Sequence, residues 1–508
     1  MQNSRTKNSK RNIISGVIKQ ISNLVLAFVI RTLILYLLGA EYQGLSGLFA
    51  SILQVLNLVD LGFSTAVTFI LYKPIALDNK NEICAILNVL RKIYIAIGCI
   101  ITILGVCIMP FIKMFVNGSI PPDINIYILF LIYLSSIAIS YFMFAYKNTL
   151  LSAEQREDVI SNIYTITSLV MRICQMTILL VFRNYMAYIT VIIIEVFVNN
   201  LLIEYASRKM YPDLVPKGKM PQNLKKKLFK QVQGVFIGKL SDVARNSLDN
   251  IIISLYLGLV SVAIYGNYFY IYTAIYGFMG IIIHGISASV GNSIATESIE
   301  KNQDDMRMFN FIFMTIVSWC TVCMYCLYQP FMRIWMHGNE AMMLTELDKS
   351  LFCVYFYAIN MTYVRSMYLD GKGLFYECRY WCIIEALGNL LLNIILGKYF
   401  GITGILWATI ITIVVCNFIG RTNILYNKYF KRGLFAFYLD HIQFIIVTVI
   451  VTFATKLILG IVVKNISNNF LLQIVICSTI SASLFIIIYF KYPLFKKTKK
   501  FMKKILNN

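Results

Sequence analysis

The residues from Phe229 to Tyr256 read FKQVQGVFIGKLSDVARNSLDNIIISLY, and this stretch decides the fold class. It is apolar and long enough to cross a bilayer, whose hydrocarbon core is about 30 Å thick. It nevertheless carries four charged side chains, namely those of Lys239, Asp242, Arg245 and Asp249. On a helix, at 100° per residue, these side chains fall within an arc of roughly 140° together with Asn246 and Asn250. We therefore expect a membrane helix with one polar face, the rest being suited to lipid.

Charges on a membrane helix indicate function because they are costly there. An ionisable side chain at the centre of a bilayer costs about 2.5–3.5 kcal/mol on insertion scales. Four of them on one face are tolerated only where that face meets the interior of a helix bundle or a water-filled cavity.

The composition extends this interpretation to the whole chain. Of its 508 residues, 58% are hydrophobic and only 14% are charged, and the mean hydropathy is +0.71. Soluble domains carry about 25% charged residues. The apolar residues come in blocks of about 20–25, the length that crosses a membrane as a helix. The sequence therefore predicts an all-α polytopic membrane protein.

We expect about fourteen transmembrane helices. They lie near residues 14–38, 45–71, 84–109, 124–146, 159–181, 185–206, 230–257, 260–290, 307–329, 350–369, 376–397, 401–425, 437–460 and 468–490.

The formal net charge of +22 follows the same topology. Most Lys and Arg residues fall in alternate connections between the expected spans, which places those connections and both termini in the cytoplasm. The 207–229 connection and the tail from Lys496 to Lys504 are especially basic. We expect them to contact anionic lipid headgroups rather than nucleic acid.

A weak internal repeat divides the chain. Leu-Gly opens a similar stretch after the first expected span, at Leu38, and after the seventh, at Leu257. Six spans separate the repeats, so both halves have the same orientation, with a pseudo-twofold axis along the membrane normal. We expect an N-terminal six-helix lobe at 1–206, a basic linker at 207–229 and a C-terminal six-helix lobe at 230–425. Two further helices and a basic tail follow at 426–508.

Two other expected spans carry polar stripes at helical spacing. The first has Gln20, Asn23, Ala27 and Arg31, and the second has Gln54, Asn57, Asp60, Ser64 and Thr68. Together with the charged span at 230–257, these helices are expected to line a central cleft between the lobes.

The charges on these stripes have different expected roles. Arg245 lies three residues after Asp242 and four before Asp249, so both carboxylates can reach it along the helix. The trio is therefore either a neutralised cluster that holds the lobe together or part of an anion-binding and gating site. No obvious carboxylate partner for Arg31 or Lys239 stands out on its own helix, which favours both as contacts for a ligand phosphate.

Other polar residues have open alternatives. Asp60 and Glu385 either bind H⁺ or Na⁺ or pair with a neighbouring Arg. The tyrosines of the eighth span, among them Tyr265, Tyr268 and Tyr272, either contact sugar or belong to an interfacial belt. Asn23, Gln54 and Asn57 are expected to give the cleft its polar lining. No residue pattern indicates a metal or another cofactor.

The segment RTLILYLLGAEYQGLSGLFASILQVLNLVDLGFSTAVTFILYKPIA, Arg31 to Ala76, resembles the amino-terminal signature of bacterial polysaccharide-biosynthesis flippases. These are the Wzx-type members of the multidrug/oligosaccharidyl-lipid/polysaccharide exporter superfamily, which includes MATE transporters. The stretch EALGNLLLNIILGKYFGITGILWATII, Glu385 to Ile411, is similar to the matching pattern in the second lobe.

This resemblance implies two lobes in a V and alternating access in the bacterial cytoplasmic membrane. The implied substrate is an undecaprenyl-pyrophosphate-linked oligosaccharide, moved from the inner to the outer leaflet for surface polysaccharide synthesis. Cationic residues line the cavities of such flippases, a character that Arg31, Lys239 and Arg245 match.

Three other functions compete with this one. A cation-coupled drug or metabolite antiporter of the same superfamily needs an acidic cleft more than a cationic one. A membrane polysaccharide polymerase or glycosyltransferase needs a larger external loop than residues 333–349 provide. A scaffold without transport leaves the polar stripes unexplained. We therefore expect a transporter and not an enzyme, and the absence of a Walker A loop excludes direct ATP hydrolysis by that motif.

Overall fold

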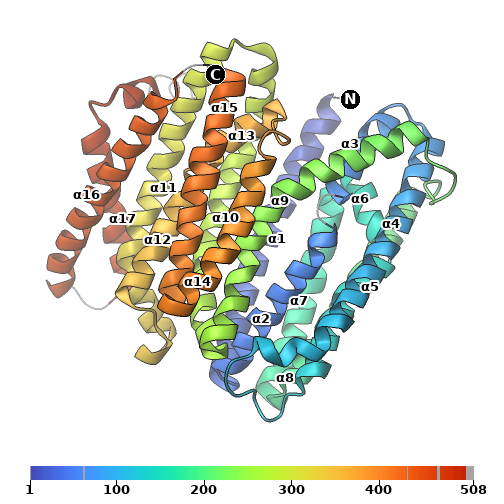
Figure 1. Cartoon of the computed structure of the whole chain (residues 1–508), viewed down its shortest axis with the longest axis horizontal. Helices are drawn as coiled ribbons and strands as arrows, with labels where there is room; N and C mark the ends of the chain where they lie inside the picture. Colours follow the sequence, from blue (N-terminus) through green and yellow to red (C-terminus); the bar gives the residue numbers. More distant parts are fainter. Residues whose placement is uncertain (1, 61–62, 432, 466–468, 499–508) are drawn as a thin grey trace. The chain divides into compact units, whose positions relative to one another are not determined.

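The computed structural model describes residues 2–60, 63–431, 433–465 and 469–498, and every regular element in these ranges is a helix. Contacts divide the chain into two compact units, Met1–Ala263 and Ile264–Asn508. We call them the N-terminal and the C-terminal unit (Figure 1). The prediction of an all-α polytopic membrane protein is confirmed.

The N-terminal unit contains nine α-helices and two short 3₁₀ segments among its described residues. They are α1 (Gln2–Leu37), α2 (Ala40–Leu56), η1 (Asn57–Asp60), α3 (Phe63–Ala76), α4 (Lys80–Ile108), η2 (Met109–Phe115), α5 (Ile126–Phe142), α6 (Ala145–Ala153), α7 (Glu157–Phe182), α8 (Tyr185–Met210) and α9 (Gln222–Leu257).

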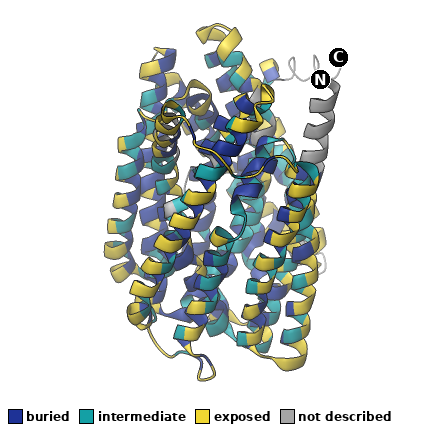
Figure 2. Cartoon of the chain, turned by 90° about the vertical axis from the view of Figure 1, so that its right-hand side faces the viewer, coloured by how far each residue is buried: buried dark blue, intermediate teal, exposed yellow. Residues whose placement is uncertain are grey.

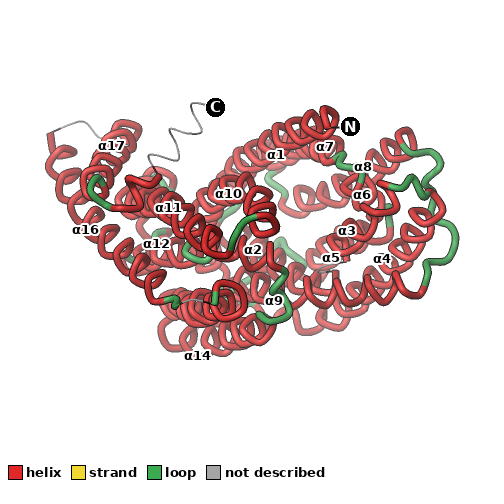
Figure 3. The backbone as a smooth tube through the Cα atoms, turned by 90° about the horizontal axis from the view of Figure 1, so that it is seen from above, coloured by secondary structure: helices red, strands yellow, loops and turns green. Residues whose placement is uncertain are grey.

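The C-terminal unit contains eight α-helices among its described residues, and α10 begins just before the division. The elements are α10 (Leu259–Thr296), α11 (Ile299–Trp335), η3 (Glu340–Met342), α12 (Glu346–Asn360), α13 (Tyr363–Lys372), α14 (Arg379–Thr412), η4 (Ile413–Arg421), α15 (Thr422–Leu425), η5 (Tyr426–Phe430), α16 (Phe435–Asn465) and α17 (Phe470–Tyr489). Both α16 and α17 pack against α11 (Figures 1 and 3).

Each of the fourteen expected spans falls on helix. By length and composition, eight helices in the described part can cross a membrane, or nine if the bent pair α5 and α6 is one span. The exact number fourteen is therefore not confirmed. Figure 2 shows exposed residues along the outward faces of the helices, and many large ones are apolar, as membrane-facing surfaces require.

Several helices begin where an asparagine accepts hydrogen bonds from the first turn. Asn125 and Asn469 each accept two backbone N–H groups through the side-chain oxygen, and Asn184 accepts one. These caps satisfy donors that the helix itself leaves unpaired. Polar residues between apolar blocks thus set where α5, α8 and α17 start.

Glycine makes the sharp turns. Gly39 before α2 has φ 122° and ψ 172°, and Gly258 before α10 has φ 83° and ψ 178°. These are the glycines of the two repeated Leu-Gly pairs, so the repeat corresponds locally to one backbone conformation. Gly401 has φ 59° and ψ −135° inside α14 and separates the eleventh and twelfth expected spans.

The basic connection before α9 is docked on the N-terminal unit rather than extended. Lys80 Nζ donates to Asp213 Oδ2 at 2.8 Å, and Asn88 Nδ2 donates to the Gly218 carbonyl at 2.8 Å. Lys147 Nζ donates to the Leu214 carbonyl at 3.3 Å. The side chain of Leu214 is buried in the core of this unit. We call residues 211–221 the strap.

The far end of α9 is also tied to the N-terminal unit. Ser254 Oγ donates to the Phe115 carbonyl at 2.6 Å, and Asn117 Nδ2 donates to the Tyr256 carbonyl at 2.9 Å. The compact units therefore divide after Ala263, whereas the sequence divides the lobes at 207–229. The division at 207–229 rests on the repeat and stays a prediction.

Candidate functional site

The second and seventh expected spans, each with a polar stripe, lie side by side as α2 and α9 in the N-terminal unit (Figure 1). Asn250 Nδ2 donates to Ser51 Oγ at 2.9 Å. Just beyond α9, the backbone of Leu259 packs closely against Gly44 of α2. A Cβ atom on Gly44 would lie only 2.1 Å from the Leu259 carbonyl oxygen. Lys239 lies near enough to Asp60 for the two charges to interact. In each of these three pairs the two residue numbers add to about 300. The stretches 44–60 and 239–259 therefore run antiparallel in one register.

This register aligns the polar positions of the two helices. Gln54 lies at the level of Asn246, and Asn57 at the level of Asp242 or Val243. Over nine residues the ladder extends about 14 Å, nearly half of the bilayer core. The side chains of Gln54, Lys239 and Asp242 are exposed on the N-terminal unit. The sequence-predicted stripes of the second and seventh spans therefore form one polar surface, which we call the α2–α9 ladder.

Arg245 holds the middle of the ladder. The residue is 5% exposed, and its Nη2 donates to Asp242 Oδ1 at 2.5 Å. Asp249, one turn further on, is 2% exposed. The expected pairing along the helix is therefore present between Arg245 and Asp242. Asp242 is itself 58% exposed, which leaves this ion pair open to solvent on one side.

Asp60 lies at the end of the ladder that Lys239 marks on α9. Polar groups of η1, α5 and α9 surround it. Its neighbours are Lys239 of α9 and Tyr141 of α5, whose hydroxyl is in hydrogen-bonding reach of the carboxylate. Tyr141 also donates to Asn57 Oδ1 at 3.2 Å. Oδ1 of Asp60 is buried and accepts no hydrogen bond in the described structure. Lys239 thus has a carboxylate neighbour from another helical segment, η1.

The polar face of α1 lies against α7 instead. Asn23 Oδ1 accepts from Ser168 Oγ at 3.3 Å. Arg31 interacts electrostatically with Tyr188 of α8, and its carbonyl accepts from Gln43 Nε2 at 3.4 Å. The structure therefore places Arg31 in the N-terminal unit, like Lys239, while nothing in it brings the two side chains into contact.

The tyrosines of α10 are inside the C-terminal unit. Tyr265, Tyr268 and Tyr272 are 1%, 0% and 3% exposed. The Tyr268 hydroxyl donates to Gln329 and accepts from the backbone of Leu344 at 3.2 Å. Their contact with sugar stays a prediction that this burial does not support.

The sequence did not identify Ser51, Tyr141 or Arg421 as site residues. Ser51 and Tyr141 join the ladder from within apolar blocks, where single polar residues give no distinct signal.

Glu385 was expected either to bind an ion or to pair with an arginine, and it pairs with Arg421 at 2.5 Å. Arg421 is in η4, a π-helical segment, and such rare segments are not recognised from an apolar pattern.

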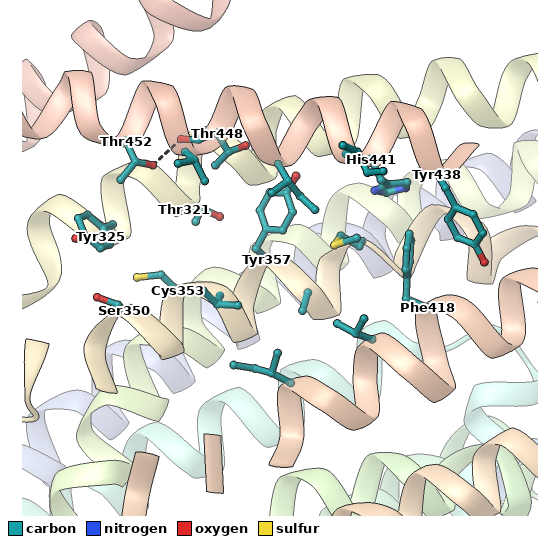
Figure 4. A pocket seen from close by; sticks show the side chains of 18 of the residues that line it. Thr321, Tyr325, Ser350, Cys353, Tyr357, Phe418, Tyr438, His441, Thr448 and Thr452 are labelled. Atoms are coloured by element: carbon teal, nitrogen blue, oxygen red, sulfur yellow. Dashed lines mark hydrogen bonds between the residues drawn. The ribbon is translucent and has the colours of Figure 1, made fainter. Parts of the chain in front are cut away.

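The C-terminal unit also contains an apolar cavity of about 550 Å³ between α11, α12, η4 and α16 (Figure 4). Tyr357 lies near its middle, and Phe418, Tyr438 and His441 lie together at one end. Its lining is almost entirely hydrocarbon and aromatic, so it suits an apolar chain rather than a polar solute.

Solved structures with a similar fold exist. The lipid II flippase MurJ, in an inward closed conformation, aligns with a TM-score of 0.64 at 17% identity, over 94% of this chain and 99% of that one. An inward-facing multidrug resistance transporter of the MATE family and MOP superfamily aligns with a TM-score of 0.64 at 14% identity, over 82% and 99%. A MOP superfamily transporter from Pyrococcus furiosus aligns with a TM-score of 0.57 at 13% identity, over 84% and 97%.

No protein-family model matches the chain, and no curated protein matches it in sequence. At these identities the structural likeness shows the fold. The chain is thus a multi-pass α-helical membrane protein with the fold that these MOP superfamily transporters share.

Proposed function

We propose that this protein is a flippase that moves a polyprenyl-pyrophosphate-linked oligosaccharide from the inner to the outer leaflet of the bacterial cytoplasmic membrane. The observation that carries the proposal is the likeness to the lipid II flippase over nearly the whole length of both chains. The multidrug transporter matches less of this chain, 82% against 94%. Both termini lie in the cytoplasm, and the transported glycan serves surface polysaccharide synthesis.

The α2–α9 ladder supports binding of the diphosphate. A pyrophosphate is an anion that carries only acceptor oxygens in the ionised form, so cationic donors recognise it. Lys239 is exposed on the ladder, and the guanidinium of Arg245 is a cation with several N–H donors. Arg31 supplies a bidentate donor from α1. Asn23, Gln54 and Asn57 add neutral polar groups to the path.

The apolar cavity of the C-terminal unit supports a substrate with a hydrocarbon tail. Removing a polyprenyl chain from water is favourable by about 25 cal/mol for each Å² of apolar surface buried. The tail therefore stays in lipid or in apolar grooves while the sugars pass through the polar path.

Asp60 and Asp249 provide carboxylates for coupling to an H⁺ or Na⁺ gradient. The transport cycle is driven by such a gradient or by consumption of the product, and the protein carries out transport rather than catalysis. Asp242 gates the path through its bond to Arg245. The basic tail and strap contact anionic lipids of the inner leaflet.

A cation-coupled antiporter of drugs or metabolites is the second candidate. The carboxylates of Asp60 and Asp249 favour it, as does the TM-score of 0.64 with the MATE-family transporter. The two functions differ in the sign of the ligand charge. A flippase needs the cations of the ladder, whereas an antiporter needs its carboxylates.

The experiment compares single alanine variants in cells that depend on the protein for glycan export. We expect Lys239→Ala and Arg31→Ala to abolish export while membrane insertion is unchanged, because each removes a phosphate contact worth about 1.5–3 kcal/mol, or roughly 10–100-fold in binding. Lys92→Ala is the control, since it removes the same charge from an exposed position of α4. Export at the normal level in both test variants would refute the phosphate contacts.

A further inference from the structure

A guanidinium without enough acceptors is buried in the C-terminal unit. Arg365, at the start of α13, is 0% exposed. Its Nη2 donates to Asn417 Oδ1 at 2.6 Å, but neither Nε nor Nη1 has an acceptor in the described structure. No carboxylate of the described residues lies within ion-pair distance of it. An arginine cannot lose its proton in a protein, so its charge and its N–H groups need a partner.

A second orphaned donor lies within electrostatic range of this arginine. His441 is 1% exposed, and its Nε2 lies 3.0 Å from Nδ2 of Asn310. Because an amide nitrogen donates, Nε2 accepts and the hydrogen of the neutral ring is on Nδ1. That Nδ1 atom is buried and has no hydrogen-bond partner in the described part of the chain.

The π-helical segment η4 contacts both groups through consecutive residues. Asn417 binds Arg365, and the next residue, Phe418, has its ring centroid 4.8 Å from that of His441. The charge of Arg365 acts on the His441 ring. Phe418 and His441 also lie together at the end of the apolar cavity (Figure 4). π-helical segments are rare and occur frequently at functional sites.

The charge of Arg365 has no directly paired counter-charge among the described residues. Arg421 is paired with Glu385 at 2.5 Å, which neutralises both. Arg421 repels Arg365, while Glu385 and Asp370 attract it from farther than ion-pair distance. Glu385 is paired with Arg421 and Asp370 lies farther away, so no carboxylate of the described residues pairs directly with Arg365. A bound group that accepts hydrogen bonds and carries one negative charge supplies this missing partner.

We propose that the C-terminal unit holds a chloride ion between Arg365 and His441. Chloride is spherical, accepts hydrogen bonds and donates none. It meets the Nε–H and Nη1–H groups of Arg365 and the Nδ1–H group of His441. A lipid phosphate is too large to reach a guanidinium that is fully buried, and a water molecule brings no charge. The ion acts as the counter-ion that fixes α13, η4 and α16 together, and it is independent of the flippase proposal.

The test uses the full-length protein purified in detergent. Thermal unfolding is followed while chloride replaces gluconate at constant ionic strength. We expect the unfolding midpoint to rise with chloride concentration and to saturate, as binding to the folded state requires. Crystals soaked in bromide are expected to show an anomalous peak in hydrogen-bonding distance of Arg365 Nε and His441 Nδ1.

Variants separate this site from general effects of salt. Arg365→Met removes the charge and keeps an unbranched side chain, and its midpoint is expected not to respond to chloride. His441→Phe keeps the ring packing and is expected to raise the chloride concentration at half-effect about tenfold, the loss of one hydrogen bond to an ion. Arg333→Gln, an exposed arginine of the same unit, is the control and should respond like the unmodified protein.

Several results would overturn the proposal. One is an unfolding midpoint that is the same in chloride and gluconate, and another is a full chloride response in His441→Phe. Density without an anomalous bromide signal, whether water or a phosphate-shaped group, would also refute it. If Arg365→Met does not fold, the bromide peak in the unmodified protein and the chloride titration of His441→Phe still test whether the site binds the ion.

Discussion

The four charged residues of α9 differ in what surrounds each of them. Lys239 is exposed beside Asp60, Asp242 is exposed beside Arg245, and Arg245 and Asp249 are buried. An exposed cation is directly available to a ligand, whereas a paired one such as Arg245 binds a ligand by exchanging its carboxylate partner for it. The same helix therefore carries both groups that keep it folded and groups that are able to bind.

A double variant distinguishes these roles for Arg245. If Arg245 only neutralises Asp242, then Arg245→Gln alone reduces export, and Arg245→Gln with Asp242→Asn restores it. If Arg245 contacts the substrate phosphate, which is the role we propose, the double variant stays at least tenfold below normal export, because the cation is still missing. The measurement is cellular glycan export at matched protein levels, and restoration by the double variant would contradict the binding role.

Gly44 shows how one residue limits the approach of α2 to the start of α10. A Cβ atom there would overlap the Leu259 carbonyl, a backbone atom that cannot rotate away. We expect Gly44→Ala to destabilise the protein by about 1–3 kcal/mol, the usual cost of overpacking. Gly238→Ala in α9 has nothing within 4 Å of the new Cβ and should be neutral or stabilising. Thermal unfolding of both variants checks this, and equal midpoints would refute the close packing.

At the scale of elements, the strap fixes α9 to the N-terminal unit. Lys80 donates a hydrogen bond to Asp213 and lowers the pKa of that carboxyl group through this bond and its charge. Because the pKa of Asp213 is lower in the folded protein, the pair is intact at neutral pH. Its contribution is lost only in acid, as the pH falls through the lowered pKa.

Trypsin measures whether the strap is held in this way, since Lys217 and Lys219 are exposed within it. We expect Asp213→Asn to speed cleavage at these lysines at pH 8 by roughly two- to fivefold, a small effect because exposed ion pairs are weak. Asp78→Asn, an exposed carboxylate before α4, is the control. Identical cleavage rates in the two variants would mean that backbone contacts alone hold the strap.

Hydrophobic block length was enough to predict where most helices lie, but the expected spans at 45–71, 124–146 and 350–369 are each divided between two α-helices. The bend between α5 and α6, at 53°, and the π-helical form of η4 were missed, because neither changes the apolar pattern. The stripe of α9 predicted the Arg245–Asp242 pair because both residues are on one helix. The pair of Lys239 with Asp60 and the burial of the α10 tyrosines depend on packing between helices, which one sequence does not contain.

For the whole molecule, the central claim is that the chain transports a lipid-linked glycan. The fold is shared with a lipid II flippase and with multidrug transporters, so the fold is compatible with either function. The two functions differ in the ligand. A diphosphate needs the cations of the α2–α9 ladder, whereas a cationic drug needs the carboxylates of the ladder.

The most direct measurement is a reconstituted flipping assay. Liposomes containing the purified full-length protein receive a fluorescent undecaprenyl-pyrophosphate-linked oligosaccharide, and a membrane-impermeant quencher reports its leaflet. We expect movement between leaflets without ATP, at the background rate with Lys239→Ala and at the normal rate with Lys92→Ala. Movement at the protein-free rate, together with ion-driven exchange of a cationic drug by the same liposomes, would contradict the proposal and establish the antiporter.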